Sequence, residues 1–162
     1  YNNPTRTGID LTPEIIDDII SQHGSQIVAI KECSGSVARI GDLVSLFKLR
    51  NYSCSVMTGD DILLIKSVQA GAAGIISVAG NLNPILVKEL IFNESIPETT
   101  LNTWNYLIQT LRLFPNPQGV KLVLGEQLKK PFVCRAFLSK FHEKERDLLF
   151  NMMDKYMKIE EF

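Results

Sequence analysis

The stretch Gln26-Ile-Val-Ala-Ile-Lys31-Glu-Cys-Ser-Gly35 decides which fold the chain is expected to adopt. Its four consecutive apolar residues, 27–30, are typical of a strand in a parallel sheet that is covered on both faces. Lys31 closes this run, and a lysine that faces the core there loses part of its hydration. That loss favours the neutral amine, which can attack a carbonyl carbon and form a Schiff base. The alternative is a lysine that extends to the rim of the sheet and pairs with a carboxylate.

Strand-like and helix-like segments alternate on both sides of this stretch. Thr12 and Pro13 open a helix in the way that an N-cap and a first-turn proline do, and Gly24 closes it. The expected strands are 27–31, 53–58 and 75–78, and the expected helices are 13–23, 37–49, 61–69 and 84–92. Alternation at this spacing predicts βαβ crossovers and a parallel sheet, which is an α/β fold.

The pattern changes at about Pro97, after which no strand is expected. Amphipathic or apolar helices are predicted at 101–113, 120–128 and 143–157. The last of them has one apolar stripe, formed by Leu148, Leu149, Met152, Met153 and Tyr156. The stripe indicates core packing rather than a cofactor site. We therefore predict an α/β body over residues 1–96 and a C-terminal helical appendage over residues 97–162.

Composition narrows the class of protein. The chain has 162 residues, of which 45% are hydrophobic and 22% charged, and these values are ordinary for a globular protein. A net charge of −1 gives no electrostatic reason to expect nucleic acid or an anionic membrane as partner. No apolar run approaches the roughly 20 residues of a membrane helix. Three cysteines without CxxC spacing and two distant histidines do not favour a metal site, and they lead us to expect a reducing, cytoplasmic location.

The number of strand–helix units is small for a closed barrel. About three complete units follow an opening segment, Tyr1-Asn-Asn-Pro4, that stands where a strand end is expected. A closed (β/α)8 barrel typically needs about 250 residues. The chain is therefore either an open α/β sheet or the carboxyl half of a TIM (β/α)8 barrel, and we favour the half barrel.

Polar or glycine-rich loops follow each expected strand. They are residues 31–35, 58–61 and 77–81, and the carboxyl ends of parallel strands lie on one face, which bears the active site in such barrels. In the opening segment, Tyr1 could relay protons and Arg6 could hold a carboxylate. Each feature also has a plainer interpretation, because Asp60 and Asp61 can cap a helix and the opening segment can be a surface loop.

Taken in order, these segments resemble one enzyme family. The motifs are Tyr-Asn-x-Pro-x-Arg-Thr-Gly from Tyr1, Ile-Lys-Glu-x-Ser-Gly around Lys31, Thr-Gly-Asp-Asp from Thr58, Gly-Ile-Ile-Ser-Val from Gly74, and Pro115-Asn116-Pro117 with Val120-Lys121. The chain resembles the dihydrodipicolinate synthase family over nearly its whole length. Several motifs in the correct order are far more specific than any one of them.

The resemblance implies a lyase of the class I aldolase type. In the family a lysine at the position of Lys31 forms a Schiff base with pyruvate, and the enamine attacks L-aspartate 4-semialdehyde, which is a step of lysine and diaminopimelate biosynthesis. Tyr1 matches the tyrosine that relays protons, and Arg6 matches the arginine that holds the aldehyde's carboxylate. Gly59 and Ile76 match positions that line the pyruvate pocket. The resemblance also implies a homo-oligomer, a tetramer or dimer, that uses no cofactor and no metal.

Two alternatives stay open at this point. One is another pyruvate aldolase, such as N-acetylneuraminate lyase, although the segment Arg6-Thr7-Gly8 favours the synthase because a small acidic aldehyde needs a cationic partner. The other is a non-catalytic, truncated half barrel that only binds or assembles. This second alternative draws on a departure from the family. The Thr-Thr-Gly-Glu loop, the second tyrosine donated across a subunit interface and most of the lysine feedback site have no counterpart in this sequence.

Overall fold

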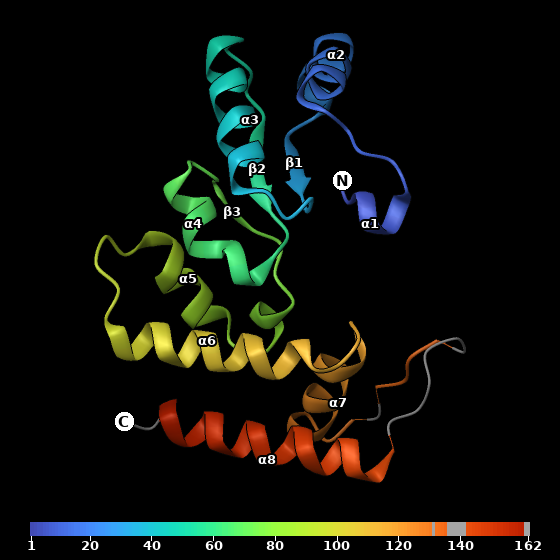
Figure 1. The fold of residues 1–162 in the computed structure, drawn as a ribbon, viewed down its shortest axis with the longest axis vertical. Helices are drawn as coiled ribbons and strands as arrows, with labels where there is room; N and C mark the ends of the chain where they lie inside the picture. Colours follow the sequence, from blue (N-terminus) through green and yellow to red (C-terminus); the bar gives the residue numbers. More distant parts are fainter. Residues whose placement is uncertain (131, 136–141, 161–162) are drawn as a thin grey trace. The chain divides into compact units, whose positions relative to one another are not determined.

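The structure is a computed structural model that describes residues 1–130, 132–135 and 142–160. Two compact units make up the chain, Tyr1–Ser77 and Val78–Phe162 (Figure 1). The division separates two sets of residues that pack mainly among themselves. The boundary expected between residues 96 and 97 is of another kind, because it marks the end of the alternating strand–helix pattern, and it stays a prediction.

A parallel sheet forms the centre of the first unit. Its strands are β1 (Ala29–Glu32), β2 (Ser55–Thr58) and β3 (Gly74–Ile75), in that order across the sheet. On the edge of β1 away from β2, Asn2 forms an isolated parallel bridge with Glu32. The parallel α/β arrangement expected from the sequence is therefore present, with the opening segment beside β1.

Each strand is shorter than the sequence predicts. The first begins at Ala29 rather than at residue 27, because the Ile27 N–H donates to Gly24 O at 3.2 Å in a turn, η1 (Gly24–Gln26). The third ends at Ile75 instead of residue 78. Ile76 N still donates to Thr58 O, but the next side chain, Ser77, hydrogen-bonds Asp61 instead of extending the ladder.

The helices of this unit begin at side-chain caps. α2 (Pro13–His23) and α3 (Val37–Leu49) are capped by Thr12 and Ser36, and Asp60 caps the turn η2 (Asp61–Leu63) that leads into α4 (Leu64–Gln69). One helix was not expected, α1 (Pro4–Thr7). The Asn3 side chain accepts from Arg6 N, a proline stands at its first position, and Gly8 ends it with a φ of 74°. What the sequence indicated as a loop is thus one helical turn.

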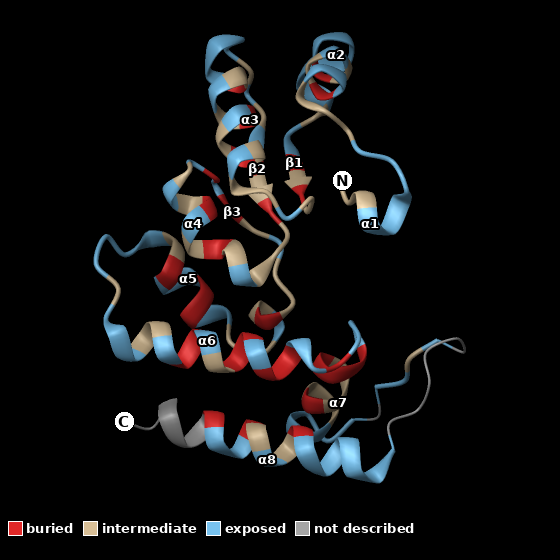
Figure 2. Ribbon diagram, viewed as in Figure 1, coloured by how far each residue is buried: buried red, intermediate tan, exposed pale blue. Residues whose placement is uncertain are grey.

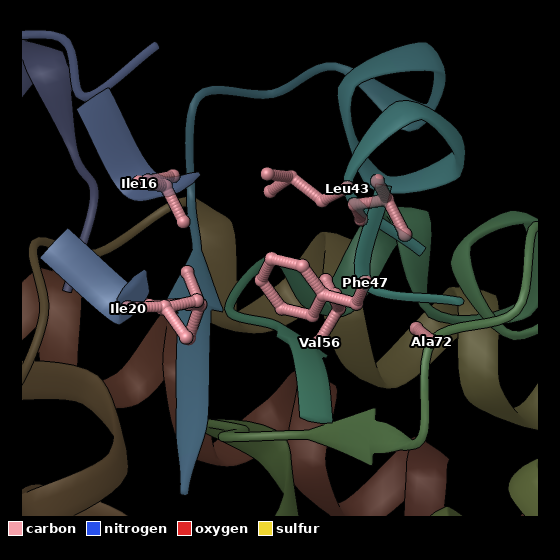
Figure 3. Close-up of a cluster of buried hydrophobic side chains, with 8 residues drawn as sticks. Ile16, Ile20, Leu43, Phe47, Val56 and Ala72 are labelled. Carbon is pink, nitrogen blue, oxygen red and sulfur yellow. The ribbon is translucent and has the colours of Figure 1, made fainter. Parts of the chain in front are cut away.

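The core of the first unit lies between α2, α3 and one face of the sheet (Figure 3). Ile30 of β1 and Val56 of β2 face this core. Buried and less buried residues alternate along both strands, so Lys31 and its register partner Met57 belong to the opposite face. The buried members of the cluster are Ile16, Ile20, Ile30, Ile40, Leu43, Phe47, Val56 and Ala72.

The described residues of the second unit form helices and connecting segments without a strand, as predicted for the tail. It comprises η3 (Ala79–Asn81), α5 (Pro84–Phe92), α6 (Glu98–Arg112), α7 (Gln118–Gln127) and α8 (Glu143–Glu160). Buried residues of α6 and α8 form much of its core (Figure 2), among them Trp104, Leu107, Leu111, Leu149, Met153 and Tyr156. Of the helices in the described part of the chain, none is long and apolar enough to cross a membrane.

Candidate active site

Lys31 occupies the carboxyl end of β1 on the face turned away from the helical core. Its neighbours in the strand, Ile30 and Glu32, are buried, whereas Lys31 is half-buried and Ala29 is exposed. The amine therefore stands on the sheet face that α2 and α3 leave uncovered. The sheet fixes the backbone of Lys31, and its side chain is only partly buried.

The ring of Tyr1 lies directly over the lysine amine. The distance from Lys31 Nζ to the centre of the ring is 4.9 Å, within the range of a cation–π contact. The Tyr1 hydroxyl accepts a hydrogen bond from Asn3 Nδ2 at 2.7 Å, which orients the phenol. An amine and a phenol are thus side by side although 30 residues separate them in sequence.

Gly59 follows β2 and leaves room for the lysine side chain. A Cβ atom at this glycine would lie 2.5 Å from Lys31 Cε and 1.9 Å from Cys33 Sγ, both far inside ordinary contact distance. Any other residue would have to displace both of these side chains. The Cys33 thiol is partly buried beside them, and this burial raises its pKa.

The remaining two predicted site residues differ in how they relate to the lysine. Ile76 follows β3 and is 50% exposed, and strand alternation after Ile75, the register partner of Thr58, puts it on the Lys31 face. Arg6 lies on α1 with an exposed side chain. Among the described residues, no hydrogen bond or ion pair joins its guanidinium to the other site residues.

A buried polar network beside the site was not predicted from the sequence. Asn2 and Glu32 are 1% and 2% exposed and are hydrogen-bonded to each other. Asn2 also contacts Asp10, which forms an ion pair with Arg39 at 3.0 Å. The hydrogen bond from Arg39, with that from Asn2, holds the pKa of Asp10 below its usual value. In the sequence, the only indication of this network was that a polar residue, Asn2, follows Tyr1 and an acidic residue, Glu32, follows Lys31.

The chemistry that this arrangement supports is nucleophilic. A lysine amine can condense with a carbonyl group, and a neighbouring phenol can pass the protons that the condensation moves. Within residues 1–130, 132–135 and 142–160, no group of three or more histidine, cysteine or acidic side chains is placed to hold a metal ion.

Comparison with known proteins identifies the family. The model of the dihydrodipicolinate synthetase family matches residues 1–155 of the chain. The chain belongs to this family. The resemblance stated from the motifs around Tyr1, Lys31 and Thr58 is therefore confirmed at the level of the family.

Two named relatives align with nearly all of the chain. The 4-hydroxy-tetrahydrodipicolinate synthase of Citrifermentans bemidjiense is 31% identical, with 98% of this chain and 55% of the relative covered. That of Syntrophus aciditrophicus is 30% identical, with 96% and 54% covered. The chain thus spans about half the length of these relatives.

Solved structures of dihydrodipicolinate synthases also match nearly all of this chain and about half of their own length. The 4-hydroxy-tetrahydrodipicolinate synthase of Methylacidiphilum fumariolicum superposes with a TM-score of 0.82 at 28% identity, covering 98% of this chain and 53% of that one. The dihydrodipicolinate synthase of Thermotoga maritima gives 0.81 at 28% identity, covering 97% and 55%. The fold of this chain, with α-helices and a short parallel sheet, is therefore consistent with part of the barrel of these enzymes.

Proposed function

We propose that the chain is the Schiff-base-forming half of a 4-hydroxy-tetrahydrodipicolinate synthase. In this proposal residues 1–96 are the carboxyl half of a TIM (β/α)8 barrel, and residues 97–162 are its C-terminal helical region. Support for the fold comes from the parallel order of β1, β2 and β3 and from the family match over residues 1–155. The observation that favours the chemistry most is the Lys31 amine under the Tyr1 ring.

The proposed reaction begins at Lys31. Its neutral amine attacks the keto carbon of pyruvate, and the carbinolamine loses water to form the Schiff base. Loss of a proton from the pyruvate methyl group gives an enamine, whose carbon attacks the aldehyde of L-aspartate 4-semialdehyde. Tyr1 is the group we assign to proton relay, because its phenol lies over the amine at which these protons arrive and leave.

Three further residues are proposed to bind substrate. Arg6 is assigned to the carboxylate of the aldehyde, since a guanidinium can donate two parallel hydrogen bonds to it. Its donors make no contact with other described side chains that would compete. Gly59 and Ile76 are assigned to the pyruvate pocket, supported by the close approach of Gly59 to Lys31 and by the exposure of Ile76 on the same sheet face.

We also propose that the parent protein is a cytoplasmic homo-oligomer, a dimer or tetramer. The support is membership of the family. One structural neighbour, 29% identical with a TM-score of 0.84, is described as the first monomeric dihydrodipicolinate synthase variant. Light scattering of the natural full-length protein gives the mass of the assembly directly. A monomer at micromolar concentration would contradict this part of the proposal.

Borohydride trapping tests the central assignment. Natural full-length protein incubated with pyruvate and borohydride should gain a stable adduct at Lys31, located by peptide mass spectrometry. Lys31→Arg should abolish the adduct, because a guanidinium stays protonated at any accessible pH. Lys66→Arg is the matched control and should leave trapping unchanged. An adduct at Lys66 or at Lys121, whose amine already donates to Val133 O at 3.0 Å, would refute the assignment.

The second substrate separates the synthase from its relatives. In the absence of borohydride, the enamine formed from pyruvate should be consumed by L-aspartate 4-semialdehyde and not by a sugar aldehyde. Faster reaction with N-acetylmannosamine would favour N-acetylneuraminate lyase instead. Complete absence of an adduct in the full-length protein would favour the non-catalytic half barrel.

A further inference from the structure

Two buried polar side chains join the segment that bears Tyr1 to the strand that bears Lys31. Asn2 is 1% exposed and Glu32 is 2% exposed. The Asn2 Nδ2 group donates to Glu32 Oε2 at 2.9 Å. Polar groups are costly to bury unless they are hydrogen-bonded, so a paired amide and carboxylate at this depth hold each other firmly in place.

Both side chains of the pair also make hydrogen bonds to other groups. Asn2 Oδ1 accepts from Leu11 N at 3.0 Å, and Asn2 Nδ2 donates a second bond to Asp10 Oδ1 at 3.0 Å. Glu32 Oε1 accepts from Ser34 N at 2.6 Å. Rotation of either side chain would break at least two of these bonds. The Asn2 side chain therefore has one preferred orientation.

Main-chain hydrogen bonds join the segment that bears Tyr1 to β1 at a single bridge. Asn2 N donates to Lys31 O at 2.9 Å, and Cys33 N donates to Asn2 O at 2.8 Å. The ladder stops there because the chain turns at once into α1, whose first residue, Pro4, has no N–H. Two main-chain bonds are a weak anchor for a segment that bears a half-exposed aromatic ring.

Strand geometry links this pair to the reactive residues. Asn2 and Glu32 are bridge partners in a parallel arrangement, so their side chains lie on the same face. Tyr1 and Lys31 immediately precede them, and successive side chains in extended backbone point to opposite faces. Fixing Asn2 against Glu32 on the buried face therefore fixes Tyr1 against Lys31 on the other face, where the 4.9 Å contact is found.

We propose that Asn2 and Glu32 are positioning residues, whose buried hydrogen bond holds the Tyr1 phenol over the Lys31 amine. The expected effect of this hydrogen bond on the reaction rate rests on the proposed function. Its expected effect on the Tyr1–Lys31 contact rests on geometry alone. Asn2 and Glu32 act through Tyr1. Within the described part of the chain, none of their side-chain hydrogen bonds is to the Lys31 amine.

A double-variant comparison tests it in the natural full-length protein. Asn2→Ala should slow trapping of pyruvate by borohydride by about 100-fold, the loss expected when a reacting group is misplaced by about 1 Å. In a Tyr1→Phe background, which has no phenol to position, Asn2→Ala should cause no further loss. The same fold-loss in both backgrounds would show a general structural effect and overturn the proposal. Glu32→Met, which has a similar length and no oxygen to accept from Asn2 Nδ2, should reproduce the pattern if Asn2→Ala does not fold.

A crystal structure of each variant provides the measurement that does not depend on catalysis. The separation between Lys31 Nζ and the Tyr1 ring centre should lengthen beyond about 6 Å in Asn2→Ala, outside cation–π range. An unchanged separation would overturn the proposal even if the rate falls. If the separation lengthens but the parent protein forms no pyruvate adduct, the proposed function fails and the positioning role stands.

Tyr52→Phe is the matched control. It removes a hydroxyl that donates to Asp17 Oδ1 at 2.6 Å. Tyr52 precedes the amino end of β2, whereas Lys31 lies near the carboxyl end of β1. Its effect on unfolding should resemble that of a lost hydrogen bond, while trapping and the Tyr1–Lys31 separation stay as in the parent. A loss of trapping equal to that of Asn2→Ala would mean that any destabilisation of this unit slows the reaction, and would also overturn the proposal.

Discussion

Replacing Gly59 with alanine is the substitution whose effect follows most directly from the structure. The new Cβ would lie 2.5 Å from Lys31 Cε and 1.9 Å from Cys33 Sγ. To reach an ordinary contact of 3.4 Å, Cε must retreat by about 0.9 Å and Sγ by about 1.5 Å. The lysine side chain is long and flexible, so it yields by rotating, and its amine moves away from the Tyr1 ring.

The rate should fall far more than the stability. A displacement of about 1 Å at the reacting amine lowers the rate by about 100-fold. Overpacking costs about 1–3 kcal/mol, partly offset by about 0.4–1 kcal/mol from the smaller conformational freedom of the unfolded chain. We therefore expect the free energy of unfolding to fall by about 1–2 kcal/mol. The measurements are the rate of borohydride trapping and the thermal unfolding midpoint of the full-length protein.

Two companion variants make this result interpretable. Gly41 lies in α3, and apart from its chain neighbours and the nearby backbone of the helix no atom lies within 4 Å of the position of its Cβ, so Gly41→Ala should change neither rate nor core packing. Adding Cys33→Ala to Gly59→Ala removes the shorter collision, and it should restore stability while the rate stays low. Normal trapping by Gly59→Ala would refute the reasoning, because it would show that the amine does not react from its position against this glycine.

Three other predictions concern the aldehyde, the thiol and the isolated chain. Arg6→Ala should raise the KM for the aldehyde by roughly one to two orders of magnitude, since a charge-assisted hydrogen bond contributes about 1.5–3 kcal/mol; an equal effect on the KM for pyruvate would indicate a general structural role. Burial raises the pKa of Cys33, so less thiolate is present at neutral pH and its alkylation by iodoacetamide should keep accelerating with pH after a small free thiol has levelled off; levelling together with the free thiol would contradict this. Residues 1–162 expressed alone should be aggregated or molten by gel filtration and near-ultraviolet circular dichroism, because strand edges and the Ala29–Ser55 side of the sheet are uncovered; a monodisperse, cooperatively unfolding monomer would disprove it.

Most of the helices and the parallel direction of the strands could be predicted because their signals are local. Thr12 and Asp60 cap helices as their positions in the sequence indicate, and helix 37–49 has the predicted bounds. The end of β3 could not be predicted in this way. It depends on a hydrogen bond between Ser77 and Asp61, which are 16 residues apart, and no periodicity records such a contact.

The candidate site was predictable to a similar degree. Lys31 and Tyr1 stand in motifs, and the structure places them together. The role of Asn2 was missed because a pattern of residue types does not show that a polar side chain is buried. Gly59 was matched by family position, whereas its close approach to the lysine is visible only in three dimensions. The binding role of Arg6 stays a prediction, since the described contacts do not link it to the lysine.

The bridge between Asn2 and β1 also bears on how the chain can be cut and rejoined. Tyr1 and Lys31 are held together across space by hydrogen bonds, and the covalent path between them passes through the exposed turn Gly24–Gln26. New termini at exposed turns are the ones that folded proteins tolerate best. A circular permutant opened at Ser25 should therefore keep Tyr1 and Lys31 in register, and an unbroken peptide chain between the two residues should be dispensable for their contact.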